Sequence, residues 1–190
     1  MNILVCIKQV PDTTEIKIDP VKHTLIREGV PSIVNPFDAC ALEMAVRLKE
    51  KEGGKVIVIS MGPAQAKNAL KECLAVGADQ AFLVTDRAFG GSDTLATSYI
   101  LSRAIAAVEA KTGEKFDLIF CGKQAIDGDT AQVGPEIAEH MDLPHVTLAT
   151  AVEMADGKLH VTRDTDEGHD LVEVSLPALV TVTKTTYDPR

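Results

Sequence analysis

The segment 123–136, KQAIDGDTAQVGPE, is the stretch of the sequence whose residue types most suggest a binding site. It follows the apolar run 118–122, so a buried strand is expected to lead directly into two carboxylates, Asp127 and Asp129, that flank Gly128. The polar and small residues before the next helical pattern outnumber the ~2 to 6 residues of a typical α/β connection. Long loops of this kind often carry function, so a ligand-binding loop and a purely structural turn are both open here.

The sequence has none of the common catalytic patterns. It contains no G-x-G-x-x-G, no G-x-x-x-x-G-K-[ST], no G-x-S-x-G and no Cys or Ser paired with a His at a recognisable spacing. The segment 127–129 resembles a calcium loop only locally, because Ala138 stands where the bidentate Glu of such a loop is required. The cysteines lack C-x-x-C spacing and are expected to be small buried side chains rather than metal ligands or a disulfide framework. They are Cys6, Cys40, Cys73 and Cys121.

Composition excludes several classes of partner. The 190 residues are 45% hydrophobic, and 19 basic against 28 acidic residues give a net charge of -9. This charge would repel nucleic acid and an anionic membrane surface. No apolar stretch approaches the ~20 residues that span a bilayer, and the start MNILVCI lacks the basic segment of a signal peptide. We therefore expect a cytoplasmic protein that binds neither nucleic acid nor a membrane.

Strand and helix patterns alternate along the first three quarters of the chain. Asn35 with Pro36 predicts the start of the first helix, whose polar face would hold Glu43, and the second helix should turn Leu74 inward. Strands are expected at 2–7, 55–60, 81–84 and 117–121, and helices from 36, from 62, from 92 or 93 to about 109, and over 130–141. Four βα units in a row predict an α/β fold with a doubly wound, mostly parallel sheet.

The last part of the chain has the pattern of antiparallel hairpins. Strands are expected at 147–154, 159–163, 170–176 and 178–183, separated by the turn signals Asp156-Gly157 and Glu167-Gly168. A further small hairpin is expected at 15–18 and 24–26. No linker-like run precedes residue 146, so residues 1–190 are interpreted as a single domain that ends with antiparallel strands over 146–184.

Several strand ends carry residues that suit a ligand. In open parallel sheets, ligands bind outside the carboxyl ends of the strands, where helix N-termini converge. The candidate segments are 7–9, 35–38, 60–63 and the loop 123–136. Alternatively, residues 35–38 form only a well-made helix cap and residues 60–63 only a strand-to-helix turn.

Four motifs carry a resemblance to a known family. VCIKQVPD, NPFDACALEMAVRLKE, VISMGPAQAKNALKECLAVGAD and CGKQAIDGDTAQVGPEIAEHMDLP resemble, in this order, the beta subunit of electron-transfer flavoprotein. The resemblance implies a Rossmann-like domain that binds an adenine nucleotide and has no catalytic residue or metal of its own. The implied nucleotide contacts are Cys6, Asn35, Pro36, Phe37, Asp38, Ser60, Met61, Gly62, Gly122, Lys123, Gln124, Asp127, Gly128, Asp129, Thr130, Ala131, Gln132 and Val133.

The resemblance also implies cofactors and partners. The expected partners are an alpha subunit that holds a redox-active FAD and a flavin-containing, acyl-CoA-type dehydrogenase. The small side chains after Asp129 resemble the flavin-bifurcating branch, which implies a second FAD in this chain rather than AMP, with NADH as electron donor. The family continues beyond the equivalent of Arg190 with a dehydrogenase recognition loop and an arm that embraces the alpha subunit. The alternative is a stand-alone adenine-nucleotide sensor without redox activity, since fold does not fix function.

The loop 123–136 has a specific role in this interpretation. The backbone N–H groups of residues 130–133 would hold a phosphate at a helix N-terminus, with the Thr130 hydroxyl as a further donor. Asp127 and Asp129 cannot face that anion, so they are expected to brace the turn or to accept from ribose hydroxyls or N–H groups. Gly128 is expected to let the backbone bend.

Overall fold

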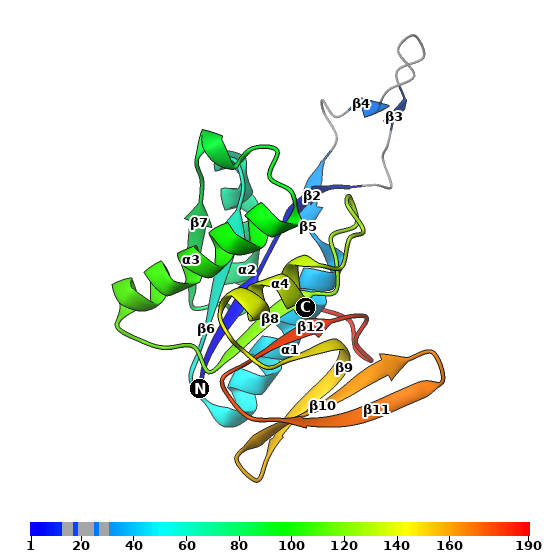
Figure 1. Ribbon diagram of the computed structural model, residues 1–190. Helices are drawn as coiled ribbons and strands as arrows, with labels where there is room; N and C mark the ends of the chain where they lie inside the picture. Colours follow the sequence, from blue (N-terminus) through cyan, green and yellow to red (C-terminus); the bar gives the residue numbers. More distant parts are fainter. Residues whose placement is uncertain (13–16, 19–24, 27–30) are drawn as a thin grey trace.

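The computed structural model describes residues 1–12, 17–18, 25–26 and 31–190. Its centre is an eight-stranded sheet with the strand order β11-β10-β9-β12-β8-β1-β6-β7 (Figure 1). The parallel part comprises β1 (Asn2–Cys6), β6 (Lys55–Met61), β7 (Gln80–Val84), β8 (Leu118–Gly122) and β12 (Ala178–Val182). Apart from β7 at the edge of the sheet, these strands are mostly apolar runs buried on both faces, as expected for a parallel sheet covered on two sides.

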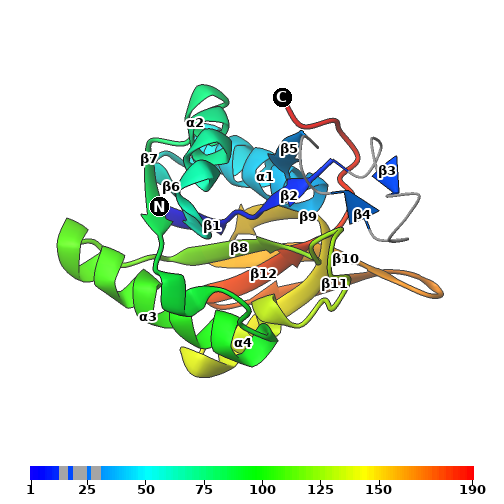
Figure 2. The same ribbon diagram turned by 90° about the horizontal axis from the view of Figure 1, so that it is seen from above.

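Two helices cover each face of this parallel sheet. The helices are α1 (Pro36–Glu52), α2 (Lys67–Ala75), α3 (Thr94–Thr112) and α4 (Val133–His140). Figure 2 shows α1 and α2 on one side of the sheet and α3 and α4 on the other. Each pair has its own apolar layer, with Met44 and Leu70 in one and Ile105 and Ile137 in the other. The predicted doubly wound α/β fold is therefore confirmed.

The antiparallel part extends the sheet at one end. Strand β9 (His145–Ala155) pairs in parallel with β12 and antiparallel with β10 (Lys158–Thr165), which pairs with β11 (Gly168–Val174). The turn between β9 and β10 places Asp156 and Gly157 at positive φ, 52° and 77°, which is the conformation that an Asp-Gly hairpin turn favours. The predicted hairpins are present in β9, β10 and β11. The expectation of antiparallel strands over the whole of 146–184 is wrong for β12, which pairs in parallel with both β8 and β9.

A second excursion leaves the sheet between β1 and α1. Strands β2 (Gln9–Pro11) and β5 (Ser32–Val34) pair antiparallel, and beyond them β3 (Lys17–Ile18) pairs with β4 (Leu25–Ile26) (Figure 1). The small predicted hairpin is confirmed for these four residues, and its positions 15, 16 and 24 lie outside the described residues. The pairing of β2 with β5 was not predicted.

Two predicted burial patterns are wrong. Leu74 is 41% exposed, because α2 turns Ala69, Leu70 and Cys73 inward and the position after Cys73 lies about 100° further round the helix. Glu43 is only 3% exposed, although it was assigned to the polar face of α1. Its carboxylate lies 2.6 Å from Nε of Arg47 and 2.8 Å from Nε of Arg190, so two guanidinium groups cover it. The sequence pattern could not show that Arg190 returns to this helix.

Candidate functional site

A pocket of about 1010 Å³ opens at the carboxyl ends of β1, β6, β7 and β8. Residues at or just after the end of each strand line the pocket: 6–8 at β1, 61–64 at β6, 85–87, 89–94 and 97 after β7, and 121–125, 128 and 130–134 at β8. Parallel strands present their carboxyl ends at the same edge, which is where ligands bind in folds of this class. The pocket therefore lies where the sequence placed a site.

Most of the predicted contact residues line this pocket. They are Cys6, Asn35, Asp38, Met61, Gly62, Gly122, Lys123, Gln124, Gly128, Thr130, Ala131, Gln132 and Val133. Pro36, Phe37, Ser60, Asp127 and Asp129 do not line it. Ser60 alternates with Met61 along β6 and is buried on the opposite face, where its hydroxyl has no hydrogen-bond partner among the described residues.

Asp38 connects the ends of two strands beneath the pocket. One carboxylate oxygen accepts the N–H of Lys8 at 2.7 Å, and the other accepts the N–H of Gly122 at 3.0 Å. Burial raises the pKa of this carboxyl to about 7, against the opposing effect of the hydrogen bonds. A Cβ at position 122 would lie 2.8 Å from the Asp38 backbone nitrogen, so only glycine allows this close approach.

Asn35 occupies the N-cap position of α1, as predicted, but its side chain does not serve as the cap. Its side chain makes no cap hydrogen bond and is 0% exposed. Instead, Nδ2 donates to the carbonyl of Gln124 at 2.8 Å, and Oδ1 accepts the N–H of Ile126 at 3.1 Å. Its own N–H donates to the carbonyl of Lys8 at 2.9 Å. Asn35 thus attaches the loop after β8 to the start of α1 and to the segment after β1.

Both carboxylates of the loop are held by nearby side chains. Nζ of Lys8 lies 2.7 Å from Oδ1 of Asp127, and Nε2 of Gln124 donates to Oδ1 of Asp129 at 2.7 Å. These contacts agree with the expected bracing role. Gly128 lies in the turn that follows Ala125, as expected, since its N–H donates to the carbonyl of Ala125 at 3.2 Å, but it does not adopt a positive φ. The left-handed residues of the loop are Asp129 and Ala131, whose φ angles are 53° and 54°.

The backbone at the start of α4 suits an anion. Helix α4 begins at Val133, three residues later than predicted, because the left-handed conformation of Asp129 and Ala131 cannot belong to a right-handed helix. Ala131 is left-handed and Gln132 is right-handed, with φ -102° and ψ -35°. Successive residues in these two conformations turn their N–H groups toward one point and form an anion-binding nest. Gln132 provides no side-chain cap for the helix.

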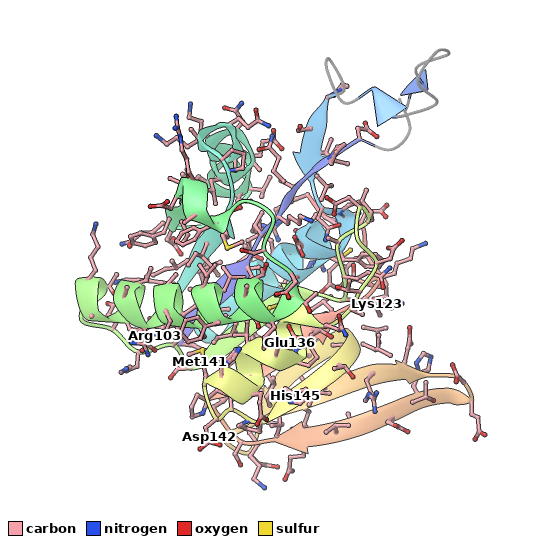
Figure 3. The ribbon with its side chains drawn as sticks, turned by 45° about the horizontal axis from the view of Figure 1, so that its top comes forward. Arg103, Lys123, Glu136, Met141, Asp142 and His145 are labelled. Atoms are coloured by element: carbon pink, nitrogen blue, oxygen red, sulfur yellow. The ribbon has the colours of Figure 1, made fainter. Side chains whose placement is uncertain are left out.

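The loop between β7 and α3 was missed by the sequence analysis. Residues 85–97 contribute to the pocket, including Arg87 in the short 3₁₀ helix η3 (Arg87–Phe89) and Thr94 at the start of α3. The Thr94 hydroxyl lies 3.1 Å from Oε1 of Glu136 on α4. Figure 3 shows Glu136 on α4 beside α3, and Lys123 in the loop after β8. The excess length of segment 85–93 over a typical connection was the signal available in the sequence.

Two thiols lie side by side at the inner end of the pocket. Cys6 and Cys121 are register partners on β1 and β8, and both line the pocket. The hydrogen bond with Cys6, followed by burial, raises the pKa of the Cys121 thiol well above its usual value, so it is protonated at neutral pH. All four cysteines are buried, as predicted. Among residues 1–12, 17–18, 25–26 and 31–190, no cluster of three His, Cys, Asp or Glu side chains could hold a metal ion.

No helix in the described part of the chain is both long and apolar enough to cross a membrane. The longest, α3, has 19 residues, but it carries Arg103, Glu109 and Lys111.

Comparison with known proteins identifies the family. The electron transfer flavoprotein domain matches residues 22–190. The chain is 58% identical to the electron transfer flavoprotein subunit beta of Thermoanaerobacterium thermosaccharolyticum, over 100% of this chain and 71% of that protein. It is 54% identical to the caffeyl-CoA reductase-Etf complex subunit CarD of Acetobacterium woodii, over 100% and 71% of the two chains. It is 51% identical to the protein FixA of Azotobacter vinelandii, over 100% and 68%. The chain therefore belongs to the electron transfer flavoprotein family, on the beta-subunit side, as the resemblance implied.

Proposed function

We propose that this protein is the beta subunit of a heterodimeric electron-transfer flavoprotein and that its pocket holds an adenine nucleotide. The observation that carries the proposal is the position of the nest at Ala131 and Gln132, beside the pocket and at the start of α4. This nest gives a phosphate several N–H donors without requiring a basic side chain. The N–H groups of residues 131–133 hold the phosphate, and the Thr130 hydroxyl donates to it.

The dimensions of the pocket favour FAD over AMP. Ligand pockets usually enclose ~300 to 1,000 Å³, and this pocket, at about 1010 Å³, lies at the upper end. It continues from the loop after β8 to the loop after β7, across the inner ends of β1 and β6. The small side chain of Ala131 leaves the start of α4 open, so a pyrophosphate can cross it and lead to a second half of the ligand.

The residues of this chain bind and orient the cofactor rather than react with it. When bound, FAD supplies the electron-transfer chemistry. Asp38 and Asn35 fix the loop that contacts the phosphate, while the paired Cys6 and Cys121 form a small, weakly polar inner wall. A catalytic residue set was not expected from the sequence, and the positions that line the pocket serve binding in this proposal.

The partner assignments follow from the relatives. The name of the matched beta subunits implies an alpha subunit, and the subunit CarD is named as part of a caffeyl-CoA reductase-Etf complex. We infer an alpha subunit with its own FAD and a flavin-containing dehydrogenase that acts on CoA thioesters. With a second FAD in the beta subunit, the complex divides the electron pair of NADH between two acceptors, as in the flavin-bifurcating branch. Residues 1–190 act as one nucleotide-binding domain within it.

Release of nucleotides from the complex tests the proposal. The protein is assembled with its alpha subunit and denatured, and the released nucleotides are separated and counted. Two FAD per heterodimer support a flavin in this chain. One FAD and one AMP retain the beta-subunit role but refute the bifurcating assignment. An adenine nucleotide in the isolated protein, with no binding of any alpha subunit, supports instead a stand-alone sensor.

A further inference from the structure

The side-chain amide of Asn35 forms its hydrogen bonds with the protein backbone, so it is not free to contact a ligand. Its donor and its acceptor both face the backbone of the loop after β8, at Gln124 and Ile126, and the side chain is fully buried. It also interacts with Asp38, whose pKa it lowers. The polar atoms of Asn35 are thus directed at the protein, although the residue borders the pocket.

The Asn35 contacts lie immediately before the strained part of the loop. Residues 124 and 126 precede Asp129 and Ala131, whose left-handed backbone costs free energy that the surrounding structure must offset. The loop has two further fixed points, the carboxylate of Asp127 on Lys8 and that of Asp129 on Gln124. Both of these contacts are exposed, whereas the Asn35 contacts are partly buried. Hydrogen bonds shielded from water hold a loop in one conformation more firmly than exposed polar contacts do.

We infer that Asn35 is a positioning residue, which holds residues 124–126 so that the nest at Ala131 and Gln132 is formed before a nucleotide arrives. This inference rests on the proposed nucleotide binding. A pre-formed nest binds more tightly than one that the ligand must order. Loss of the Asn35 contacts should therefore weaken binding of the phosphate, although Asn35 itself does not contact the phosphate.

Replacement by aspartate gives a test with a distinctive pH dependence. In Asn35→Asp the ionised carboxylate still accepts the N–H of Ile126, but it repels the carbonyl of Gln124 and the carboxyl of Asp38. When protonated, the new side chain donates its O–H to that carbonyl and accepts from Ile126, as the amide does. Nucleotide affinity of Asn35→Asp should fall about tenfold or more at high pH and recover toward the wild-type value as the pH is lowered. Asn35→Ala should lose affinity at every pH.

The charged groups near position 35 are present in every variant. They are Asp38 on α1, Lys8 after β1, and Lys123, Asp127 and Asp129 in the loop. Affinity for AMP and for FAD is therefore measured by calorimetry between pH 5 and pH 9 and expressed as the ratio to wild type at each pH. Asn68→Asp, a matched change at an exposed position of α2, serves as the control for an added charge and should keep a ratio near one.

Hydrogen exchange of the Ile126 amide gives a readout that global destabilisation does not reproduce. In the nucleotide-free protein, exchange at Ile126 should accelerate in Asn35→Ala, while amides in the centre of β6 keep their protection. Uniform acceleration across the sheet would show a merely structural role and overturn the inference. Unchanged affinity in Asn35→Asp, with a wild type that binds, would overturn this inference alone. A wild type that binds neither AMP nor FAD would refute the proposed function and this inference with it.

Discussion

The Nζ of Lys8 lies 2.7 Å from the Oδ1 of Asp127, so an ion pair joins the segment after β1 to a loop 119 positions further along the chain. The side chains are 48% and 31% exposed, which makes the pair a modest contributor to folding. The pair lies beside the pocket and fixes one side of the loop after β8, so it should matter more for ligand binding than for folding.

This ion pair should affect binding more than stability. We expect Lys8→Met to lower the free energy of unfolding by less than ~1 kcal/mol, and to weaken nucleotide binding several-fold because the loop loses an attachment. Lys55→Met is a matched control, since Lys55 pairs with Glu114 at 2.7 Å with exposures of 47% and 34%, away from the pocket. Urea denaturation and calorimetry compare the two. Equal affinities in the two variants would show that the Lys8 pair has no part in binding.

Gly122 at the end of β8 and Gly128 in the loop that follows should differ strongly in their tolerance of alanine. In Gly122→Ala the new Cβ would lie 2.8 Å from the backbone nitrogen of Asp38, and the shift needed should cost about 1 to 3 kcal/mol of stability. In Gly128→Ala the new Cβ meets nothing within 4 Å, and no positive φ opposes it, so a change under ~0.5 kcal/mol is expected. Thermal unfolding distinguishes them. A large loss in Gly128→Ala would contradict the described loop conformation.

Asp38 should give stability a pH dependence opposite to that of an ordinary paired carboxyl. Its pKa is raised from 3.8 to about 7, so the folded protein binds a proton more tightly than the unfolded chain does. The contribution of this group is therefore greatest below about pH 4 and is lost as the pH rises through 7, at up to ~1.4 kcal/mol per pH unit. The difference in unfolding free energy between wild type and Asp38→Asn, measured in urea at several pH values, should follow this slope. A pH-independent difference would refute the raised pKa.

Glu43 should be far more important for stability than its neighbour Glu50. Glu43 is buried and faces both Arg47 and Arg190, whereas Glu50 contacts Arg190 from an exposed position. Glu43→Ala removes a buried side chain and two ion pairs but leaves behind arginines that water can still reach, so it should cost about 1 to 2 kcal/mol, whereas Glu50→Ala should have a much smaller effect. Because its arginine partners lower the pKa of Glu43 against the effect of burial, its contribution is present above the unfolded pKa and is lost in acid. Denaturation at pH 7 checks the first expectation, and similar losses in both variants would contradict it.

The sequence predicted the alternation of strands and helices because buried parallel strands and amphipathic helices have different periods. It could not predict how Asn35 is used, since an Asn before Pro at a helix start has the same pattern whether its side chain caps the helix or bonds Gln124 and Ile126. The late start of α4 was hidden for a related reason. Ala131 is a good helix former, and only the tertiary structure holds it at a φ of 54°.

Most of the predicted site residues lie around one pocket at the strand ends, and this pocket extends beyond the predicted set. The resemblance implied contacts at residues 6, 35–38, 60–62, 122–124 and 127–133. It implied none in the loop after β7, although Thr85 and Arg87 line the same pocket. Burial of Glu43 depends on Arg190, 147 positions away, and no local pattern reports such a contact.

The place of β12 between β8 and β9 has a consequence for the order of folding on the ribosome. When residues 118–155 have emerged, β8 and β9 have no strand to join them, and the edge of β8 stays open until residues 178–182 are made. The N–H of Lys123, the first residue of the loop after β8, donates to the carbonyl of Val182 at 2.6 Å. This contact also cannot form until residues 178–182 have been made. Contacts between such distant residues form late. The proposed nucleotide should therefore bind a nascent chain only after β12 has inserted into the sheet, late in synthesis.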